Sequence, residues 1–122
     1  WMKDIRTLHD LVDEELAAVC FVRDYVEFCF DGPILRALVP PILACDGTQI
    51  TFPDPTSRDQ LCALIGTTVQ RVELQDDVAI TLTFTSGHVL RIRLDDDARA
   101  RIWPESEAAH FVPGIGKPIQ VW

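Results

Sequence analysis

The chain repeats a pattern of apolar residues, and this repeat is the strongest constraint on its fold. Seven positions recur 53 residues later with the same or a similar side chain: Leu8, Leu11, Val12, Leu16, Val19, Phe21 and Asp24 correspond to Leu61, Leu64, Ile65, Val69, Val72, Leu74 and Asp77. Further on, the segment 32–36 recurs as the segment 87–91, at a spacing of 55. Because each copy of a repeated pattern makes the same local structure, the repeat predicts two similar halves.

Each copy predicts a short helix followed by three strands. Apolar residues at helical spacing open each copy, and Gly66 and its counterpart Asp13 stand where the two helices should end. Alternating apolar residues follow, with turn signals at 31–32 and 86–87 before the third strand. Since a small sheet with one apolar face cannot bury that face alone, we expect the two halves to pack together.

The sequence therefore predicts one α+β domain, in which a helix-plus-three-strand unit occurs twice in a mostly antiparallel sheet. The first unit should span about 4–45 and the second about 57–100, related by an approximate two-fold axis. Prolines make the segment 40–55 a connector, with a short edge strand at 50–52. The tail from 101 to 122 should pack on the sheet, with a helix or turn at 104–111 and a final strand at 119–122.

The four cysteines are spaced too widely for a zinc ribbon or a thioredoxin-like site, which need a Cys-x-x-Cys pair. If Asp24 and Tyr25 form the centre of a tight turn, Cys20 lies opposite Cys29, and cross-strand partners are close enough for a disulfide. Reduced, buried or half-buried thiols are the alternative, because a chain with an adequate core inside the cell does not require disulfides.

The net charge of −8 sets limits on the partners of this chain. A negative sum of this size repels phosphate backbones and anionic membrane surfaces, so binding to nucleic acid or membranes is disfavoured and a basic protein is attracted. No apolar run reaches the roughly 20 residues that span a bilayer, and acidic residues interrupt the first stretch, unlike a secretory signal. We therefore expect a cytoplasmic protein.

No pattern of residues typical of catalysis or metal binding is present in the sequence. The three histidines, His9, His88 and His110, belong to no recognised catalytic motif. The aspartate runs 76–77 and 95–97 lack the alternation and the glycine of a calcium loop, which favours solvated loops. The sequence thus predicts no catalytic residue, no metal and no cofactor.

Two sets of residues are candidates for binding. The acidic run Asp13, Glu14 and Glu15, together with the aromatic Tyr25, is a candidate surface for a protein partner. Pairing of exposed strand edges in a homodimer is another interpretation.

Arg36 and Arg91 occupy equivalent places in the two copies. With His110, they could clamp an anion or carboxylate in a groove between the halves. Ion pairs with nearby carboxylates on the sheet surface are the alternative.

Two segments resemble a family of small bacterial proteins for which no activity is established. They are Phe-Val-Arg-Asp-Tyr-Val-Glu at 21–27 and the ending at 104–122, with its Pro-Glu-Ser, Ala-His-Phe-Val-Pro and Pro-Ile-Gln-Val-Trp runs. Some small acidic bacterial domains of this kind are encoded as immunity partners of toxins, so the resemblance implies a role in protein binding.

These observations favour a non-enzymatic acidic protein-interaction module, such as an immunity or antitoxin-like partner of a basic protein. The alternative is a small-molecule or anion-binding protein, or an enzyme, that uses a groove between the two halves.

Overall fold

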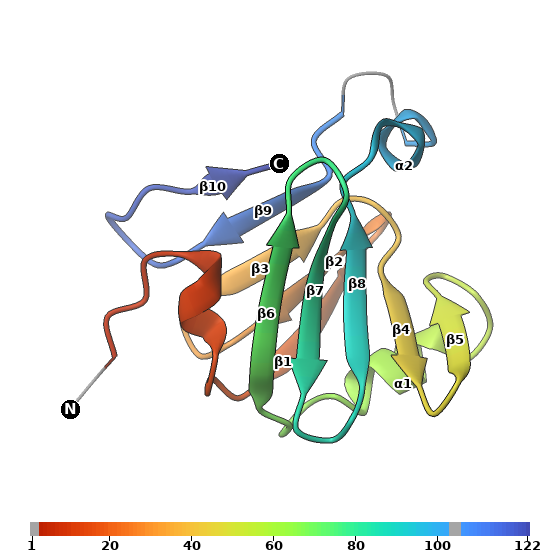
Figure 1. Ribbon diagram of the computed structural model, residues 1–122, viewed down its shortest axis with the longest axis horizontal. Helices are drawn as coiled ribbons and strands as arrows, with labels where there is room; N and C mark the ends of the chain where they lie inside the picture. The colour runs from red at the N-terminus through yellow and green to blue at the C-terminus, as the bar shows by residue number, and fades with distance from the viewer. Residues whose placement is uncertain (1–2, 103–105) are drawn as a thin grey trace.

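The structure, a computed structural model, describes residues 3–102 and 106–122 of the chain. These residues form two five-stranded antiparallel sheets, one in front of the other in Figure 1, and three short helices. The fold is therefore mostly β with some helix, in agreement with the predicted α+β class. No helix in the described residues is long and apolar enough to cross a membrane.

The first sheet has the strand order β1-β2-β3-β9-β10, and the second has the order β5-β4-β8-β7-β6. The strands of the first sheet are β1 (Ala18–Val22), β2 (Tyr25–Cys29), β3 (Ile34–Ala37), β9 (Ala109–Val112) and β10 (Gln120–Val121). Those of the second sheet are β4 (Ile42–Cys45), β5 (Thr48–Thr51), β6 (Val69–Gln75), β7 (Ala79–Phe84) and β8 (Val89–Arg93). The helices are the 3₁₀ helix η1 (Leu8–Leu11) and the α-helices α1 (Ser57–Cys62) and α2 (Asp96–Ala100).

Each sheet contains strands from both halves of the chain. β1, β2 and β3 follow one another, but β9 and β10, which complete their sheet, come from the end of the chain. Conversely, β4 and β5 follow β3 in sequence but complete the sheet formed by β6, β7 and β8. The chain thus crosses to the second sheet after β3 and returns to the first after β8, so neither sheet is complete without the other half.

Antiparallel backbone hydrogen bonds join the segment after η1 to the segment after α1. The Asp13 N–H donates to the Val69 carbonyl, and the Gly66 N–H donates to the Leu16 carbonyl, each at 2.8 Å. Both Asp13 and Gly66 have left-handed backbone angles, with φ of 74° and 90°. The two bonds are equivalent under the repeat, because Asp13 corresponds to Gly66 and Leu16 corresponds to Val69 at the spacing of 53 residues.

A second reciprocal pair of bonds completes the same junction. The Leu16 N–H donates to the Thr67 carbonyl, and the Val69 N–H donates to the Glu14 carbonyl, each at 2.9 Å. The four bonds together give partners to four backbone N–H groups and four backbone carbonyls where the halves meet. We call the paired segments 13–16 and 66–69 the junction.

The apolar faces of the two sheets meet in one core. Phe28, Leu35 and Phe111 of the first sheet are fully buried in it, as are Leu82 and Leu90 of the second. Because neighbouring side chains along a strand point to opposite faces, the residues between these positions point outward. Polar side chains are therefore available on the outer faces of the sheets, while the space between the sheets is filled.

The β1–β2 hairpin corrects the predicted register. Val22 pairs with Tyr25, so the turn is Arg23-Asp24, and Cys20 lies opposite Glu27 rather than Cys29. All four cysteines are free. The true register differs from the predicted one by two residues along the partner strand, which leaves every side chain on the same face. The alternation of apolar residues could not separate the two registers for this reason.

The predicted connector and tail are also corrected. The segment 40–55 contains a complete hairpin, β4–β5, whose turn is Asp46-Gly47 with φ of 51° and 78°, the angles that favour an Asp-Gly turn. The edge strand expected at 50–52 corresponds to the second half of β5, which starts at Thr48 and ends at Thr51. The helix or turn predicted at 104–111 is wrong for residues 109–111, because these belong to the strand β9. Residues 104 and 105 of the same prediction lie outside the described residues.

The aspartates at 95–97 open the helix α2 instead of forming the predicted loop. The Asp95 carboxylate caps this helix, because its Oδ2 accepts a hydrogen bond from the Ala98 N–H at 3.4 Å. Aspartates in the first turn are favourable at a helix N-terminus, where the backbone N–H groups lack partners inside the helix.

Gly66→Ala should destabilise the protein by about 1 kcal/mol, because a left-handed angle strains a residue that carries a Cβ atom. No heavy atom lies within 4 Å of the position that this Cβ would take, so a clash would not contribute. Gly66→Asn should cost less, since asparagine adopts left-handed angles more readily. Urea unfolding measures both changes, and an alanine variant as stable as the original chain would contradict the account of the junction.

Candidate functional site

A row of polar side chains crosses the outer face of the first sheet. Glu27 of β2, Arg36 of β3 and His110 of β9 lie directly opposite one another on neighbouring strands. The Nε and Nη2 atoms of Arg36 both contact Glu27 Oε2 at 2.8 Å. Arg36 Nη1 lies 3.0 Å from His110 Nδ1. These three residues are linked through a single guanidinium group.

The contacts of His110 define its protonation. A guanidinium group can only donate hydrogen bonds, so Nδ1 of His110 must accept the one from Arg36. The ring proton is then on Nε2, which donates to Glu107 Oε2 at 2.8 Å. The imidazole is neutral in this arrangement, and neither ring nitrogen is available to act as a base on a substrate.

Tyr25 extends the row toward a cavity at the end of the sheet. The Arg36 Cζ atom lies 5.9 Å from the centre of the tyrosine ring, within the range of a cation–π contact. The cavity has a volume of about 290 Å³. It is lined by Asp24, Tyr25, Leu38, Ile102, Ser106 and Glu107. We call it the tyrosine cavity.

The charges around the tyrosine cavity favour a cation. Glu27 neutralises Arg36, and their side chains are only 17% and 27% exposed, so this ion pair is held away from bulk water. Glu107 contacts a neutral histidine, and Asp24 has no side-chain partner in the described part of the chain. Two carboxylates therefore line a cavity whose other described lining residues are mainly aromatic and aliphatic.

Three of the predicted site residues come together here, although the sequence assigned them to different sites. Tyr25 was expected in a protein-binding surface, and Arg36 and His110 in an anion clamp. Arg91, the third residue of the expected anion clamp, is on β8 of the other sheet, where its side chain points outward between the buried Leu90 and Ile92. Arg36 and Arg91 thus lie on the outer faces of different sheets and do not flank one groove.

The predicted acidic run lies at the junction, away from Tyr25. Asp13 and Glu15 are exposed, while Glu14 is half-buried and lines a second cavity of about 360 Å³ together with Asp31, Lys3 and Lys117. Tyr25 begins β2, whereas Asp31 follows the end of β2, so the two cavities lie at opposite ends of that strand. The two lysines supply positive charge beside Glu14, which makes this end less acidic than the sequence indicated.

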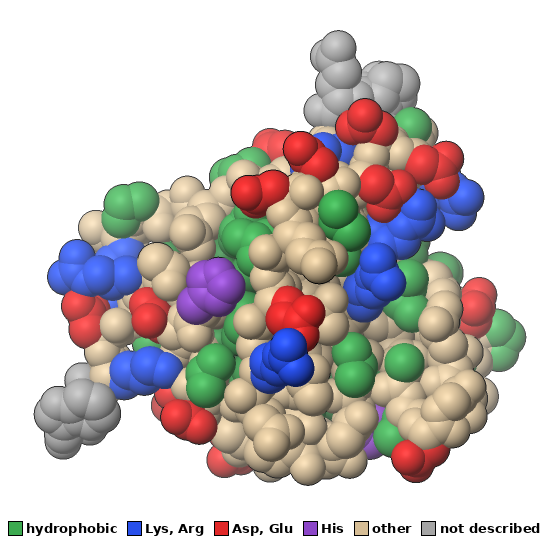
Figure 2. Space-filling view, in the orientation of Figure 1, with side chains coloured by type: hydrophobic (Ala, Val, Ile, Leu, Met, Phe, Trp, Pro, Cys, Tyr) green, Lys and Arg blue, Asp and Glu red, His purple; other side chains and the backbone are tan. Residues whose placement is uncertain are grey.

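A larger group of carboxylates, which the sequence analysis did not select, lies beside the tyrosine cavity. Arg99 Nη1 is 3.9 Å from both Asp77 Oδ1 in the β6–β7 turn and Asp96 Oδ1 in α2, so these elements are neighbours. Figure 2 shows acidic side chains gathered over this end of the molecule. Ile102, whose N–H donates to the Arg99 carbonyl, continues from α2 into the cavity wall. The repeat could have pointed to this group of carboxylates, because it matches Asp24 with Asp77 and both are turn residues.

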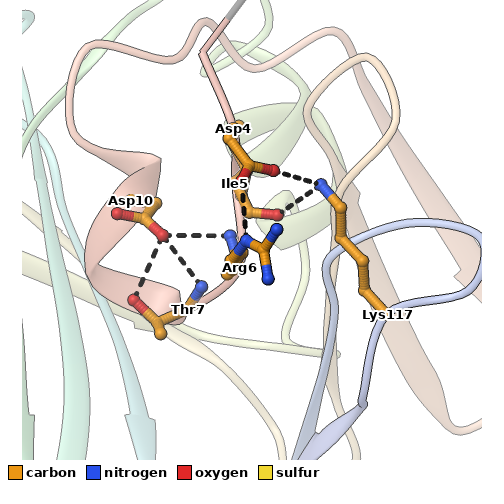
Figure 3. Close-up of polar contacts among 6 residues, drawn as sticks. All are labelled: Asp4, Ile5, Arg6, Thr7, Asp10 and Lys117. Carbon is orange, nitrogen blue, oxygen red and sulfur yellow. Dashed lines mark hydrogen bonds and ion pairs between the residues drawn. The ribbon is translucent and has the colours of Figure 1, made fainter.

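Lys117 holds the N-terminal segment against the tail (Figure 3). Its Nζ donates to Asp4 Oδ1 at 3.0 Å and to the Ile5 carbonyl at 2.8 Å. Asp10 Oδ2 accepts the backbone N–H groups of Arg6 and Thr7, each at 3.0 Å. These backbone hydrogen bonds hold the pKa of Asp10 below its ordinary value of 3.8.

Comparisons with protein-family models, with curated proteins and with solved structures find no match to this chain. Among residues 3–102 and 106–122, no group of three or more histidine, cysteine, aspartate or glutamate side chains could hold a metal ion. The arrangement that the described residues offer is a partly buried polar row beside an acidic, apolar-walled cavity.

The tautomer of His110 can be tested directly by ¹⁵N NMR of the imidazole ring. We expect the spectrum at neutral pH to show a protonated Nε2 and an unprotonated Nδ1. Arg36→Leu should remove the donor to Nδ1 and leave the Glu107 contact as the remaining preference for a protonated Nε2, so the share of this tautomer should fall. A ring protonated at Nδ1 in the original chain would contradict the polar row.

The lowered pKa of Asp10 predicts a loss of stability in acid. The folded pKa lies below the unfolded value, so the contribution is present above about pH 4 and is lost as the pH falls through the folded pKa. Asp10→Asn should therefore make the urea concentration at the unfolding midpoint depend less on pH. The range to measure is about pH 5 to about pH 2, within which this carboxylate titrates. Asp59→Asn, at an exposed position in α1, is the matched control. Equal pH dependence in the two variants would contradict this role.

Proposed function

We propose that this chain is a non-enzymatic protein-interaction module that binds a basic protein at one end of the sandwich. This end, which we call the acidic end, consists of the β1–β2 turn, the β6–β7 turn, α2 and the start of the strand β9. Its carboxylates belong to Asp24, Asp76, Asp77, Asp95, Asp96, Asp97 and Glu107. An immunity or antitoxin-like role, in which these carboxylates cover a basic surface of a toxin, is one use of such a module.

The tyrosine cavity is the observation that carries this proposal. A long cationic side chain of a partner can place its aliphatic stem against Leu38 and Ile102 and its charged group near Asp24 and Glu107. The ring of Tyr25 adds a surface on which a planar guanidinium group can stack. Aromatic residues beside a pocket are also frequent centres of binding energy in protein interfaces. We therefore assign the central contact to an arginine of the partner.

The surrounding charge supports the same kind of partner. Asp77 and Asp96 have side chains 89% and 106% exposed, so their carboxylates remain accessible even though Arg99 lies 3.9 Å from each. Exposed ion pairs of this kind contribute little to stability and are readily exchanged for contacts with a partner. The net charge of −8 would also accelerate the encounter with a basic protein, most strongly at low salt.

We further propose that the two halves are copies of one helix-plus-three-strand unit related by an approximate two-fold axis. The reciprocal bonds of the junction support this, since each has an equivalent at the repeat spacing. The matched crossings after β3 and after β8 support it as well. In this interpretation the acidic end contains the same element from each copy. The β1–β2 turn with Asp24 is the equivalent, in the first copy, of the β6–β7 turn with Asp77 in the second.

The proposal predicts that the acidic end, and not the acidic junction, selects the partner. The tagged protein would be used to capture proteins from lysate of the cells that produce it, at low and high salt. We expect a basic protein to be retained at low salt and released at high salt. The double variant Asp24→Asn, Glu107→Gln should retain at least about tenfold less of it, because two charges opposite a cation are lost.

Two controls make the result specific to this end. Gln at position 107 keeps an oxygen that can accept the hydrogen bond of His110, so the polar row is preserved. The matched double variant Asp13→Asn, Glu15→Gln removes the same number of charges at the junction and should retain as much partner as the original chain. Equal loss in both double variants, or retention of no basic protein, would contradict the proposal.

A further inference from the structure

A separate cavity lies on the outer face of the second sheet, between the strands and α2. It has a volume of about 320 Å³, at the lower end of the range for small-molecule sites. Its lining residues are Val39, Pro40, Ile42, Gln49, Thr51, Arg93, Ala98, Arg101 and Ile102. We call it the α2 cavity.

Most of the wall of the α2 cavity is apolar, which is the usual composition of a site for an organic ligand. Ile42 of β4 and Thr51 of β5 are paired neighbours on the outer face, and Gln49 lies two residues before Thr51 on that face. Ala98 of α2 is buried. The threonine and glutamine side chains supply hydrogen-bonding groups at one side of the cavity.

Arginines supply the charge at this cavity. Arg93 and Arg101 line it, and Arg91 lies on the same face, two residues from Arg93 and directly opposite Ile42. Figure 2 shows basic side chains grouped beside acidic ones in the region of α2. Arg91 has no ion pair with any residue of the described segments. Two cationic side chains therefore line the cavity, and a third, Arg91, lies beside it on the same face of the sheet.

Aspartates hold two of these arginines in position without using all their donors. Arg93 donates from Nε to Asp95 Oδ1 at 2.9 Å and from Nη2 to Asp95 Oδ2 at 2.6 Å. Arg101 Nη2 lies 3.1 Å from Asp97 Oδ2. Within the described residues, the Nη1 group of each arginine has no protein partner. Both arginines can thus donate to a ligand while their aspartate contacts remain in place.

We propose that the α2 cavity binds a small organic carboxylate, with its apolar body against Ile42 and Ala98 and its carboxylate near the arginines. A guanidinium group matches the two oxygens of a carboxylate in a paired geometry, which fits this head group. The apolar wall favours a ligand with a hydrocarbon body over inorganic phosphate. This site shares Ile102 with the tyrosine cavity but is otherwise lined by different residues, and it does not depend on the proposed protein partner.

The test uses 3-phenylpropanoate as the probe, with the neutral 3-phenylpropanamide and inorganic phosphate as comparisons. Titration of the ¹⁵N-labelled chain, followed by amide shifts, measures both the affinity and the place of binding. We expect 3-phenylpropanoate to shift the amides of Ile42, Thr51 and Ala98. The amide and phosphate should bind about tenfold more weakly or not at all, because each lacks the charge or the apolar body.

Variants of the arginines separate this site from general attraction of anions. Arg101→Gln and Arg91→Gln should each weaken binding of 3-phenylpropanoate several-fold and leave the rest of the spectrum unchanged. Ala98→Leu should block binding by filling the cavity. Arg71→Gln is the control, since Arg71 is exposed on β6 and pairs with Glu73 at 2.8 Å.

The proposal would be overturned by several results. These are equal affinity for the neutral amide, shifts confined to residues outside the α2 cavity, equal weakening by Arg71→Gln, or no shift at the highest soluble concentration. Because none of these measurements involves the protein partner, failure here leaves the proposed function standing. Loss of partner capture at the acidic end would likewise leave the carboxylate site unaffected.

Discussion

The backbone pairing at the junction is the contact on which the rest of the structure depends. Four reciprocal hydrogen bonds join the segments that follow η1 and α1, and both segments lead directly into the first strand of a three-stranded meander. This pairing places the two meanders so that their apolar faces meet in one core. The crossings after β3 and β8 then let each half complete the sheet of the other, which ties the halves together through both sheets.

This arrangement determines where chemistry is available. The filled core leaves the outer faces and the ends of the sandwich for polar side chains, and neighbouring strands bring residues together that are distant in sequence. Glu27, Arg36 and His110 form a row for this reason, and Glu107 and Tyr25 connect that row to a cavity. On the other sheet, the position opposite Arg91 is occupied by Ile42 rather than by a histidine. The two arginines that match in the sequence repeat therefore lie in different environments, one paired with Glu27 and one beside the α2 cavity.

Part of this structure could be predicted from the sequence. Apolar alternation located most strands of both meanders, because one face of each strand is buried. It could not separate the registers of β1 and β2, since a two-residue shift keeps Cys20 and Cys29 on the same face. The contact of Arg36 with His110 spans 74 residues and requires β9 to pair with β3, which no local pattern indicates. The acidic end was missed because its turns and α2 are adjacent only after folding.

The most direct test of the account is a titration of the ¹⁵N-labelled chain with a short acetylated peptide that contains one arginine, compared with the same peptide containing citrulline. Citrulline keeps the shape of arginine but has no charge. The account predicts that the arginine peptide shifts the amides of Tyr25, Leu38, Ile102 and Glu107, and that the citrulline peptide does not. Shifts centred on the junction residues Asp13 to Glu15, or equal shifts with both peptides, would contradict it.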